Sequence, residues 1–464
     1  MGTALDSALL GRYDRPGPRY TSYPSALQFS PAFTAAELRR EVTRSNEEPI
    51  PRDLSLYVHV PYCFSPCFYC GCNRIITRDL SRAAPYVERV VREAERVSQL
   101  FVRSRTVRQV HFGGGTPNFL PPPLLGQLLE SLGRYFRLSN SPERDFSIEL
   151  DPRWLNDGDI AAYAAMGFNR ASLGVQDFDR AVQLAINREQ GVDETLRVIE
   201  DCRRAGFRSV NVDLIYGLPQ QTTGGFAATL ETILRARPDR VAIYGYAHMP
   251  QLFKAQKQIV ESELPDAALR VRLLALAIER LTAAGYRHIG LDHFALPEDD
   301  LTRALDANSL HRNFMGYTTH ADCDLVGLGV SAISHIGDSY SQNFRGLPEW
   351  EAAVDQDRLP TWRGVALDED DIIRADVIQQ VMCRGSIDRR AIGLRHDIDF
   401  DEYFADALDS LAALQLDGLV EIDSERLTVT SRGRYLLRMI AMCFDRYANT
   451  PVAQAERPRH SRVV

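Results

Sequence analysis

Three closely spaced cysteines, Cys63, Cys67 and Cys70, follow an apolar run in the segment YVHVPYCFSPCFYCGC. Thiolates are soft ligands that suit zinc or an iron–sulfur cluster. Structural zinc needs four ligands, usually as two separated pairs, and no second pair follows at the usual spacing, so that Cys72 or His59 would have to complete such a site. Three thiolates alone suit a 4Fe–4S cluster with one open iron, which can bind a cofactor and pass it an electron. We therefore predict a cluster on Cys63, Cys67 and Cys70, with a zinc site as the alternative.

A triple glycine follows the next apolar run, in HFGGGTP at residues 111–117. Glycine lets a backbone approach a ligand closely, although an ordinary tight turn between a strand and a helix would use the same residues. The segment is not a Walker loop, because no Gly-Lys-Ser/Thr follows it. The cysteine segment follows the preceding apolar run, and its presence favours the interpretation that the glycines approach a ligand.

Short β-branched or apolar runs must position these segments, and amphipathic helical stretches separate most of the runs. The runs are residues 54–60, 108–113, 146–150, 171–176, 209–217 and 240–247. Strands that alternate with helices predict a parallel sheet, either doubly wound or closed into a barrel, and both place function at the carboxyl ends of the strands. Loops from many consecutive strands converge on one point more easily in a barrel. We therefore predict an α/β fold with a partial or full (β/α) TIM-like barrel.

The 464 residues are too many for one typical domain, and the sequence pattern divides them into five parts. We predict an extended N-terminal arm over the active site (1–50), a barrel core (51–290), a barrel extension and connector (291–365), a mainly helical, winged-helix-like C-terminal domain (366–447) and a disordered tail (448–464). The winged-helix pattern carries no basic face for DNA, so we interpret that domain as a structural cap.

The charge distribution bears on possible partners. The net charge is −8 and no basic stripe is visible, which argues against nucleic acid as a partner. Only two of the 54 basic residues are lysines, Lys254 and Lys257. A bias in genome composition explains this excess of arginine, and arginine would also suit a substrate with several carboxylates.

The remaining cysteines and the apolar runs indicate the compartment. Cys202, Cys323, Cys383 and Cys443 lie singly in apolar surroundings, as small core residues in a reducing compartment would. No uninterrupted run of roughly 18 apolar residues predicts a membrane span. The N-terminal segment has no basic region of the kind that begins a signal peptide. We expect a cytoplasmic protein.

Motifs along nearly the whole chain resemble those of one family within the radical S-adenosylmethionine (SAM) superfamily, the oxygen-independent coproporphyrinogen III oxidases. They are RPGPRYTSYP, CFYCGCN, GGGTP, GFNRASLGVQDF, NREQ, VDLIYGLPQQ, YAHMP, GLDHFALP, HRNFMGYTT, GVSAIS and CFDRY. A related branch, the radical SAM heme chaperones, lacks the N-terminal motif and is described with an HNxxY motif. Residues 311–315, HRNFM, do not fit that motif. The sequence therefore resembles the oxidases more than the chaperones, and a heme chaperone is the alternative function.

The resemblance implies a 4Fe–4S cluster and two SAM molecules. The first SAM, on the open iron, would contact Tyr57, Gly114, Glu149 and Ile333. The second SAM would contact Tyr69, Gly115, Thr116, Gln176, Arg188, Asp213 and Ala247. The residue types suit these contacts, because carboxylates accept from ammonium and ribose hydroxyl groups and arginine pairs with a carboxylate.

The resemblance further implies an oxidoreductase of heme biosynthesis, a coproporphyrinogen dehydrogenase. Reductive cleavage of SAM would give a 5′-deoxyadenosyl radical, and two propionates of coproporphyrinogen III would become vinyl groups in protoporphyrinogen IX. The electron donor and the final electron acceptor are unidentified, and we expect a monomer. Arg15, Arg19 and Arg312 are candidates for the substrate carboxylates. Met315 stands where the family pattern has glutamine, so a role of that glutamine has no counterpart here.

Overall fold

The computed structural model describes residues 7–448 and 461–462. Most of the predicted disordered tail, residues 448–464, lies outside these ranges. No helix in the described part of the chain combines the length and the hydropathy needed to cross a bilayer.

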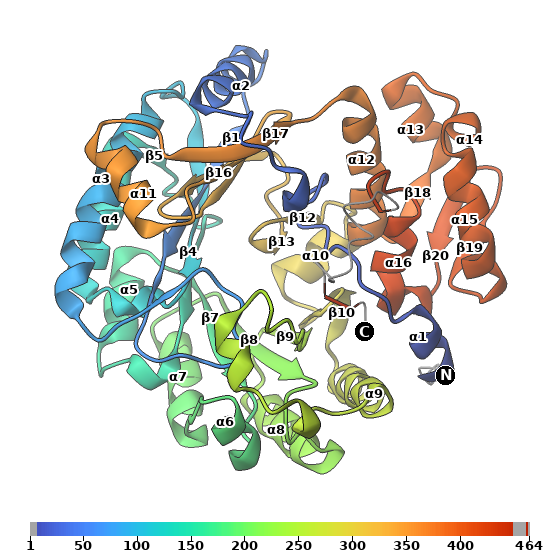
Figure 1. The fold of residues 1–464 in the computed structure, drawn as a ribbon, viewed down its shortest axis with the longest axis horizontal. Coiled ribbons are helices and arrows are strands. Elements are labelled where there is room, and N and C mark those ends of the chain that lie inside the picture. The colour runs from blue at the N-terminus through green and yellow to red at the C-terminus, as the bar shows by residue number, and fades with distance from the viewer. Residues whose placement is uncertain (1–6, 449–460, 463–464) are drawn as a thin grey trace.

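A curved sheet of parallel strands forms the larger part of the molecule (Figure 1). All six predicted strands are present, as β1 (Asp53–Val60), β4 (Thr106–Gly114), β6 (Asp145–Leu150), β7 (Arg170–Gln176), β8 (Ser209–Tyr216) and β9 (Arg240–Gly245). They lie side by side in chain order, and β14 (Cys323–Leu328) pairs with β1 in the same direction.

The connecting helices cover the outer face of this sheet (Figure 1). They are α3 (Ala83–Ser98), α4 (Pro122–Tyr135), α5 (Asp159–Met166), α6 (Arg180–Ala185), α7 (Val192–Arg204) and α8 (Thr223–Ala236). A doubly wound sheet would carry helices on both faces. The prediction of a partial (β/α) barrel is therefore confirmed.

Antiparallel strands extend both edges of the sheet, so that it does not close. After α9 (Ala267–Ala283), β10 (Arg287–Gly290) and β11 (His293–Ala295) form a hairpin. At the other edge, β14 is followed by β15 (Ile333–Ile336), β16 (Ser339–Asn343), helix α11 (Leu347–Asp355) and β17 (Thr361–Ala366).

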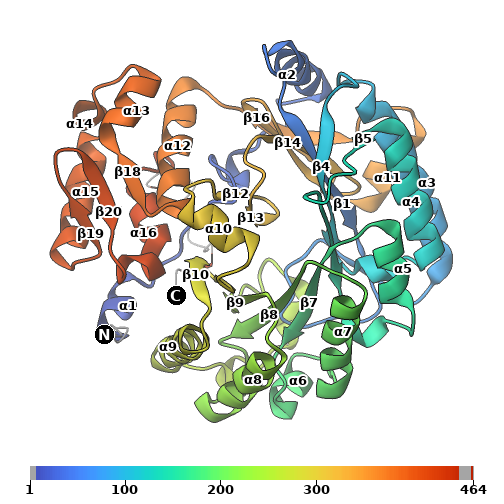
Figure 2. The ribbon, with the colours of Figure 1, turned by 180° about the vertical axis from the view of Figure 1, so that it is seen from behind.

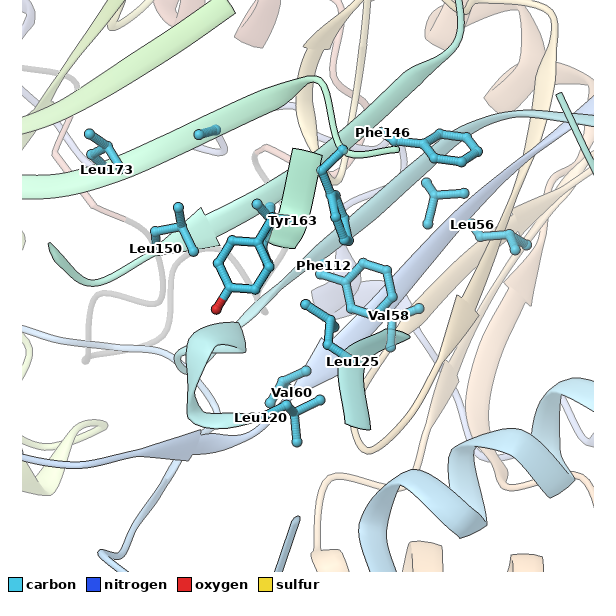
Figure 3. Packing of buried hydrophobic residues seen from close by; sticks show 14 of the residues in the cluster. Leu56, Val58, Val60, Phe112, Leu120, Leu125, Phe146, Leu150, Tyr163 and Leu173 are labelled. Carbon is cyan, nitrogen blue, oxygen red and sulfur yellow. The ribbon is translucent and has the colours of Figure 1, made fainter. Parts of the chain in front are cut away.

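The main core lies between the sheet and its outer helices. Alternate residues of a strand point to opposite faces, so Leu56, Val58 and Val60 on β1 all point outward. They pack with Phe112 of β4 and Leu125 of α4 (Figure 3). The residues between them point into the concave side of the sheet, where chemistry is possible.

The C-terminal part has a second core and stands apart from the parallel sheet (Figures 1 and 2). It contains α12 (Glu369–Cys383), α13 (Arg389–His396), α14 (Phe400–Tyr403), α15 (Ala405–Leu416), α16 (Leu437–Met442), β18 (Ser386–Asp388), β19 (Val420–Ile422) and β20 (Arg426–Val429). Strands β19 and β20 pair as a hairpin, and β18, which the sequence analysis did not predict, pairs with β20. Three residues are too few to show a period.

Three further segments contribute to the second core: α10 (Asp300–Asp306), the hairpin of β12 (His311–Asn313) and β13 (Gly316–Thr318), and the N-terminal arm. The arm contains α1 (Ser7–Tyr13), which the sequence did not predict, then non-helical chain before α2 (Ala35–Glu47). Tyr20 and Tyr23 are buried in the second core. The Tyr20 hydroxyl donates to Asp445 at 3.0 Å.

Candidate active site

A row of polar side chains crosses the concave face of the sheet, because the register of the parallel strands brings alternate residues into line. Tyr57 of β1 pairs with His111 of β4, and Glu149 of β6 pairs with Ser172 of β7. The next pairing joins Gly174 of β7 to Asp213 of β8. This row of polar residues extends toward the carboxyl ends of the strands.

A cavity of about 270 Å³ lies at those carboxyl ends. All three predicted cluster ligands line it, together with eight of the eleven predicted SAM residues. Those eight are Tyr69, Gly114, Gly115, Thr116, Glu149, Gln176, Arg188 and Asp213.

The cysteine loop is held in shape by backbone and arginine hydrogen bonds. It leaves β1, pairs as β2 (Tyr62–Cys63) with β3 (Ile75–Ile76), and encloses the other two cysteines. Arg74 donates to the carbonyl oxygens of Cys67 at 2.9 Å and Cys70 at 3.0 Å. A half-buried guanidinium that bonds two carbonyls fixes the turn that carries both thiols.

The thiols have different surroundings. Burial raises the pKa of Cys63 to about 12, whereas hydrogen bonds from Cys72 lower the pKa of Cys70 to about 6. Arg188 Nη1 lies 3.5 Å from Cys67 Sγ, and the Thr116 hydroxyl lies 3.3 Å from Cys63 Sγ. These donors can bond to sulfur that carries negative charge, as in a thiolate ligand.

The site fits a 4Fe–4S cluster. All three thiols are free and line one cavity, and thiolates are the ligands that iron–sulfur clusters use. Within the described residues, no group of three or more His, Cys, Asp and Glu could hold one metal ion together. A cluster does not need such convergence, since each cysteine binds a different iron.

The triple glycine docks directly against the cysteine loop. The amide of Gly115 donates to Val60 O, and the amide of Thr116 donates to Tyr62 O, both at 2.8 Å. A Cβ at Gly115 would lie 2.7 Å from the backbone of Pro61, and Gly114 has φ of +108°. Glycine is therefore required here, as the sequence analysis argued from close approach.

Glu149 points from the end of β6 toward this glycine loop. Its carboxylate accepts from the Gly114 amide at 3.1 Å and lies 3.1 Å from His111 Nε2. Burial favours the neutral acid, but these two partners hold the pKa of Glu149 below its usual value. An ionised Glu149 can accept hydrogen bonds from an ammonium group.

Arg188 is a second charged residue in the cavity lining. It pairs with Asp151 at 3.1 Å and donates to Gly174 O at 2.6 Å. Arg153 also pairs with Asp151, at 2.7 Å. The Nε atom of Arg188 is buried with no hydrogen-bond partner in the described structure, so the guanidinium keeps capacity for a ligand carboxylate.

Asp213 and Gln176 complete the floor of the cavity. Asp213 accepts from Ser172 Oγ and Asn211 Nδ2, both at 2.9 Å, and burial raises its pKa to about 6. The strand register shifts beside Gln176, whose φ is +69°. This irregularity lies at the end of β7, where Gln176 lines the cavity.

The three predicted SAM residues outside the cavity lining lie beside it. Tyr57 stacks on His111 with ring centroids 5.8 Å apart, and it pairs across the sheet with Gly327. A Cβ at Gly327 would lie 2.6 Å from Ile333 O, so Ile333 lies next to Gly327, the strand partner of Tyr57. Ala247 follows β9 and is tied to the cysteine loop through Gln256.

Gln256 is a positioning residue that the sequence analysis missed. Its side chain is buried, and its amide donates to Tyr69 O at 2.9 Å and to Ala247 O at 3.1 Å. It thereby joins two of the predicted contacts of the second SAM. Arg74, Arg153 and the cavity-lining Tyr244 were also missed. No spacing signal marks Gln256, because its bond to Tyr69 joins residues 187 positions apart. Arg74 and Arg153 bond to residues within seven positions in the chain, but they belong to no motif that the sequence analysis used.

Comparison with known proteins agrees with this site. Residues 57–233 match the model of the radical SAM superfamily, and residues 367–436 match the HemN C-terminal domain. The fold and the cysteine-lined cavity therefore define a radical SAM enzyme, with a 4Fe–4S cluster and SAM as cofactors.

Relatives that match over the full length of the chain show which radical SAM family it belongs to. The chain is 45% identical over 459 residues to the oxygen-independent coproporphyrinogen III oxidase of Pseudomonas aeruginosa, covering 99% of this chain and 98% of the relative. It is 43% identical to that of Escherichia coli K12 with the same coverage. The solved Escherichia coli coproporphyrinogen III oxidase matches with a TM-score of 0.90, covering 95% of this chain and 99% of that one. The chain belongs to the family of oxygen-independent coproporphyrinogen III oxidases.

Proposed function

We propose that the protein oxidatively decarboxylates two propionate side chains of coproporphyrinogen III to vinyl groups without oxygen, giving protoporphyrinogen IX for heme biosynthesis. The observation that carries this proposal is the convergence of three free thiols, Glu149, Arg188 and Asp213 on one cavity, in a chain that matches such oxidases from end to end. No feature of the described site favours the heme chaperone.

The cluster and SAM, when bound, supply a radical that can remove hydrogen from an unactivated propionate carbon. Cys63, Cys67 and Cys70 would hold the cluster. Tyr57, Gly114, Glu149 and Ile333 would hold the first SAM, with Glu149 accepting from its ammonium group.

The second SAM would contact the remaining predicted residues, which are Tyr69, Gly115, Thr116, Gln176, Arg188, Asp213 and Ala247. Arg188 would pair with its carboxylate, and Asp213 would accept from its ribose hydroxyls. The arm would cover the substrate entrance and exclude water from the radical. We place the enzyme in the cytoplasm as a monomer that takes single electrons from a donor and passes electrons to an acceptor, both unidentified.

An anaerobic assay with a chemical reductant, SAM and coproporphyrinogen III tests the function. Chromatography should show loss of coproporphyrinogen and formation of the divinyl product, with 5′-deoxyadenosine released alongside. Release of 5′-deoxyadenosine with coproporphyrinogen left intact would contradict the proposed substrate while leaving the radical chemistry standing.

Asp213 should make binding of the second SAM depend on pH. Because its pKa is about 6, the carboxylate is ionised above that pH and loses its acceptor capacity as the pH falls. We expect the KM for SAM in vinyl formation to rise about fourfold between pH 7.5 and pH 5.5. Asp213→Asn should raise this KM at pH 7.5 and flatten its pH profile. An unchanged profile in Asp213→Asn would assign the dependence to another group.

Arg438 should control the docking of the arm. It is buried in the second core, and its guanidinium donates to Pro18 O at 3.0 Å, to Gly17 O and to Ser461 O at 2.8 Å. Arg438→Met leaves these carbonyls without a donor, so trypsin should cleave the arm faster and vinyl formation should fall while the cluster is retained. Arg390→Met, at an exposed position on α13, is the matched control. Unchanged cleavage and turnover would show that the arm docks without Arg438.

A further inference from the structure

Two arginines from distant parts of the chain meet beside the β12–β13 hairpin. Arg312 of β12 lies opposite Tyr317 of β13 in the register, and its guanidinium sits over the Tyr317 ring at 4.7 Å. Its Nε lies 3.3 Å from the carbonyl oxygen of Arg19 in the arm. The arm and the hairpin thus bring Arg19 and Arg312 together.

Arg312 is buried without a carboxylate partner. Only 3% of the residue is exposed, and its Nη1 atom is fully buried with no hydrogen-bond partner in the described structure. Among residues 7–448 and 461–462, neither terminal nitrogen of Arg312 forms a salt bridge. A buried guanidinium normally has acceptors for its donors, so a ligand that supplies them is missing.

The surrounding charges leave this region positive. Arg19 pairs with Asp292, and its side chain keeps 32% exposure, so a ligand can reach it. Within the described part of the chain, Arg438 bonds only to uncharged acceptors, which are the carbonyl oxygens of Gly17, Pro18, Ser461 and Arg462 and the hydroxyl of Ser461. Burial and the charges of Arg312 and Arg438 lower the pKa of Arg19 to about 10, as expected where positive groups outnumber their partners.

The positive region adjoins the cavity of the cluster through one aromatic side chain. Tyr244 at the end of β9 lines that cavity, and the Arg19 guanidinium lies 5.4 Å from its ring centroid. His293 packs edge-on against Tyr244 at 5.9 Å and against Tyr317 at 5.3 Å. A molecule that binds the arginines therefore lies next to the place where SAM would react.

We propose that Arg19 and Arg312 together bind one carboxylate of the substrate and so determine which propionate faces the radical. This inference rests on the proposed function, because it takes the substrate to be a tetrapyrrole with propionate side chains. Guanidinium groups bind carboxylates through paired hydrogen bonds, which gives orientation as well as affinity. Arg15, the third arginine that the sequence suggested, is exposed and contacts Met439 instead.

Binding of coproporphyrin III and of its tetramethyl ester to the anaerobic holoenzyme tests the proposal without turnover. Fluorescence titration should show that Arg312→Gln weakens binding of the tetraacid by about 10- to 100-fold, the range for a lost charged hydrogen bond in a buried site. Binding of the ester should change little, because the ester carries no carboxylate. Arg312→Lys keeps the positive charge but loses the paired guanidinium donors. It should therefore weaken tetraacid binding less than Arg312→Gln. Arg12→Gln, at an exposed arginine of α1, is the control.

Equal losses for the tetraacid and the ester, or wild-type affinity of Arg312→Gln for the tetraacid, would overturn the proposal. Melting temperatures of the variants separate misfolding from a binding defect, and Arg19→Gln provides a second test on the half-buried member of the pair. These titrations are independent of turnover. Failure of wild-type protein to form vinyl groups would count against the proposed function, while the carboxylate-dependent binding would still support the arginine site.

Discussion

Replacing Cys67 with Ser is expected to remove the visible iron–sulfur absorption and to reduce SAM cleavage below detection. Cys67 shares one cavity with Cys63 and Cys70, and its sulfur faces the guanidinium of Arg188 at 3.5 Å. A serine hydroxyl is a poor ligand for iron and would leave only two thiolates. Absorption spectra and iron and sulfide analysis of anaerobically purified protein measure the loss.

The neighbouring Cys72 provides the matched control. Its amide lies 3.4 Å from Cys70 Sγ, and its side chain also lines the cavity, so Cys72→Ser perturbs the same loop. Because only the other three cysteines have the predicted spacing, Cys72→Ser should keep most of the iron. Full cluster retention in Cys67→Ser, or equal loss in both variants, would mean that the ligand set is assigned wrongly.

The second large effect is expected at Glu149 and Arg188, with different consequences for the two SAM molecules. Glu149→Ala should suppress 5′-deoxyadenosine release even without porphyrinogen, because that step needs only the cluster, an electron and the first SAM. Arg188→Ala should spare this release better but lose vinyl formation. Each loss of a charged hydrogen bond in a desolvated site costs roughly 1.5–3 kcal/mol, or about 10- to 150-fold in affinity.

The test compares 5′-deoxyadenosine released with and without coproporphyrinogen, beside the divinyl product. Arg153→Ala is an informative comparison, because it removes the other arginine from Asp151 and leaves Arg188 in place. Wild-type SAM cleavage and normal product in both Glu149→Ala and Arg188→Ala would make these positions structural.

Local sequence patterns predicted the parts of the molecule whose structure depends on neighbouring residues. The run at residues 54–60 predicted β1, and the cysteine spacing is contained in one loop. Eight of the eleven SAM contacts that the family resemblance implied line the cavity, since they lie at or just beyond the carboxyl ends of parallel strands. Parallel register then brings them together without further information.

The features that the sequence did not reveal depend on partners far along the chain. Strand β18 has three residues and is defined by pairing with β20. Gln256 stands in a region without periodicity and gains its role by reaching Tyr69, 187 positions away. The arginine site likewise requires the arm and the hairpin to meet, which no local pattern encodes.

The contact between Tyr20 and Asp445 has a consequence for folding while the polypeptide is being synthesised. The two residues are 425 positions apart, and the arm is made first while its binding surface is made near the end. At roughly 5–20 residues per second, the arm waits about 20–90 s before its docking surface emerges. During that interval the arm has not docked on the second core, and iron and sulfide can reach the cysteine loop of the nascent barrel.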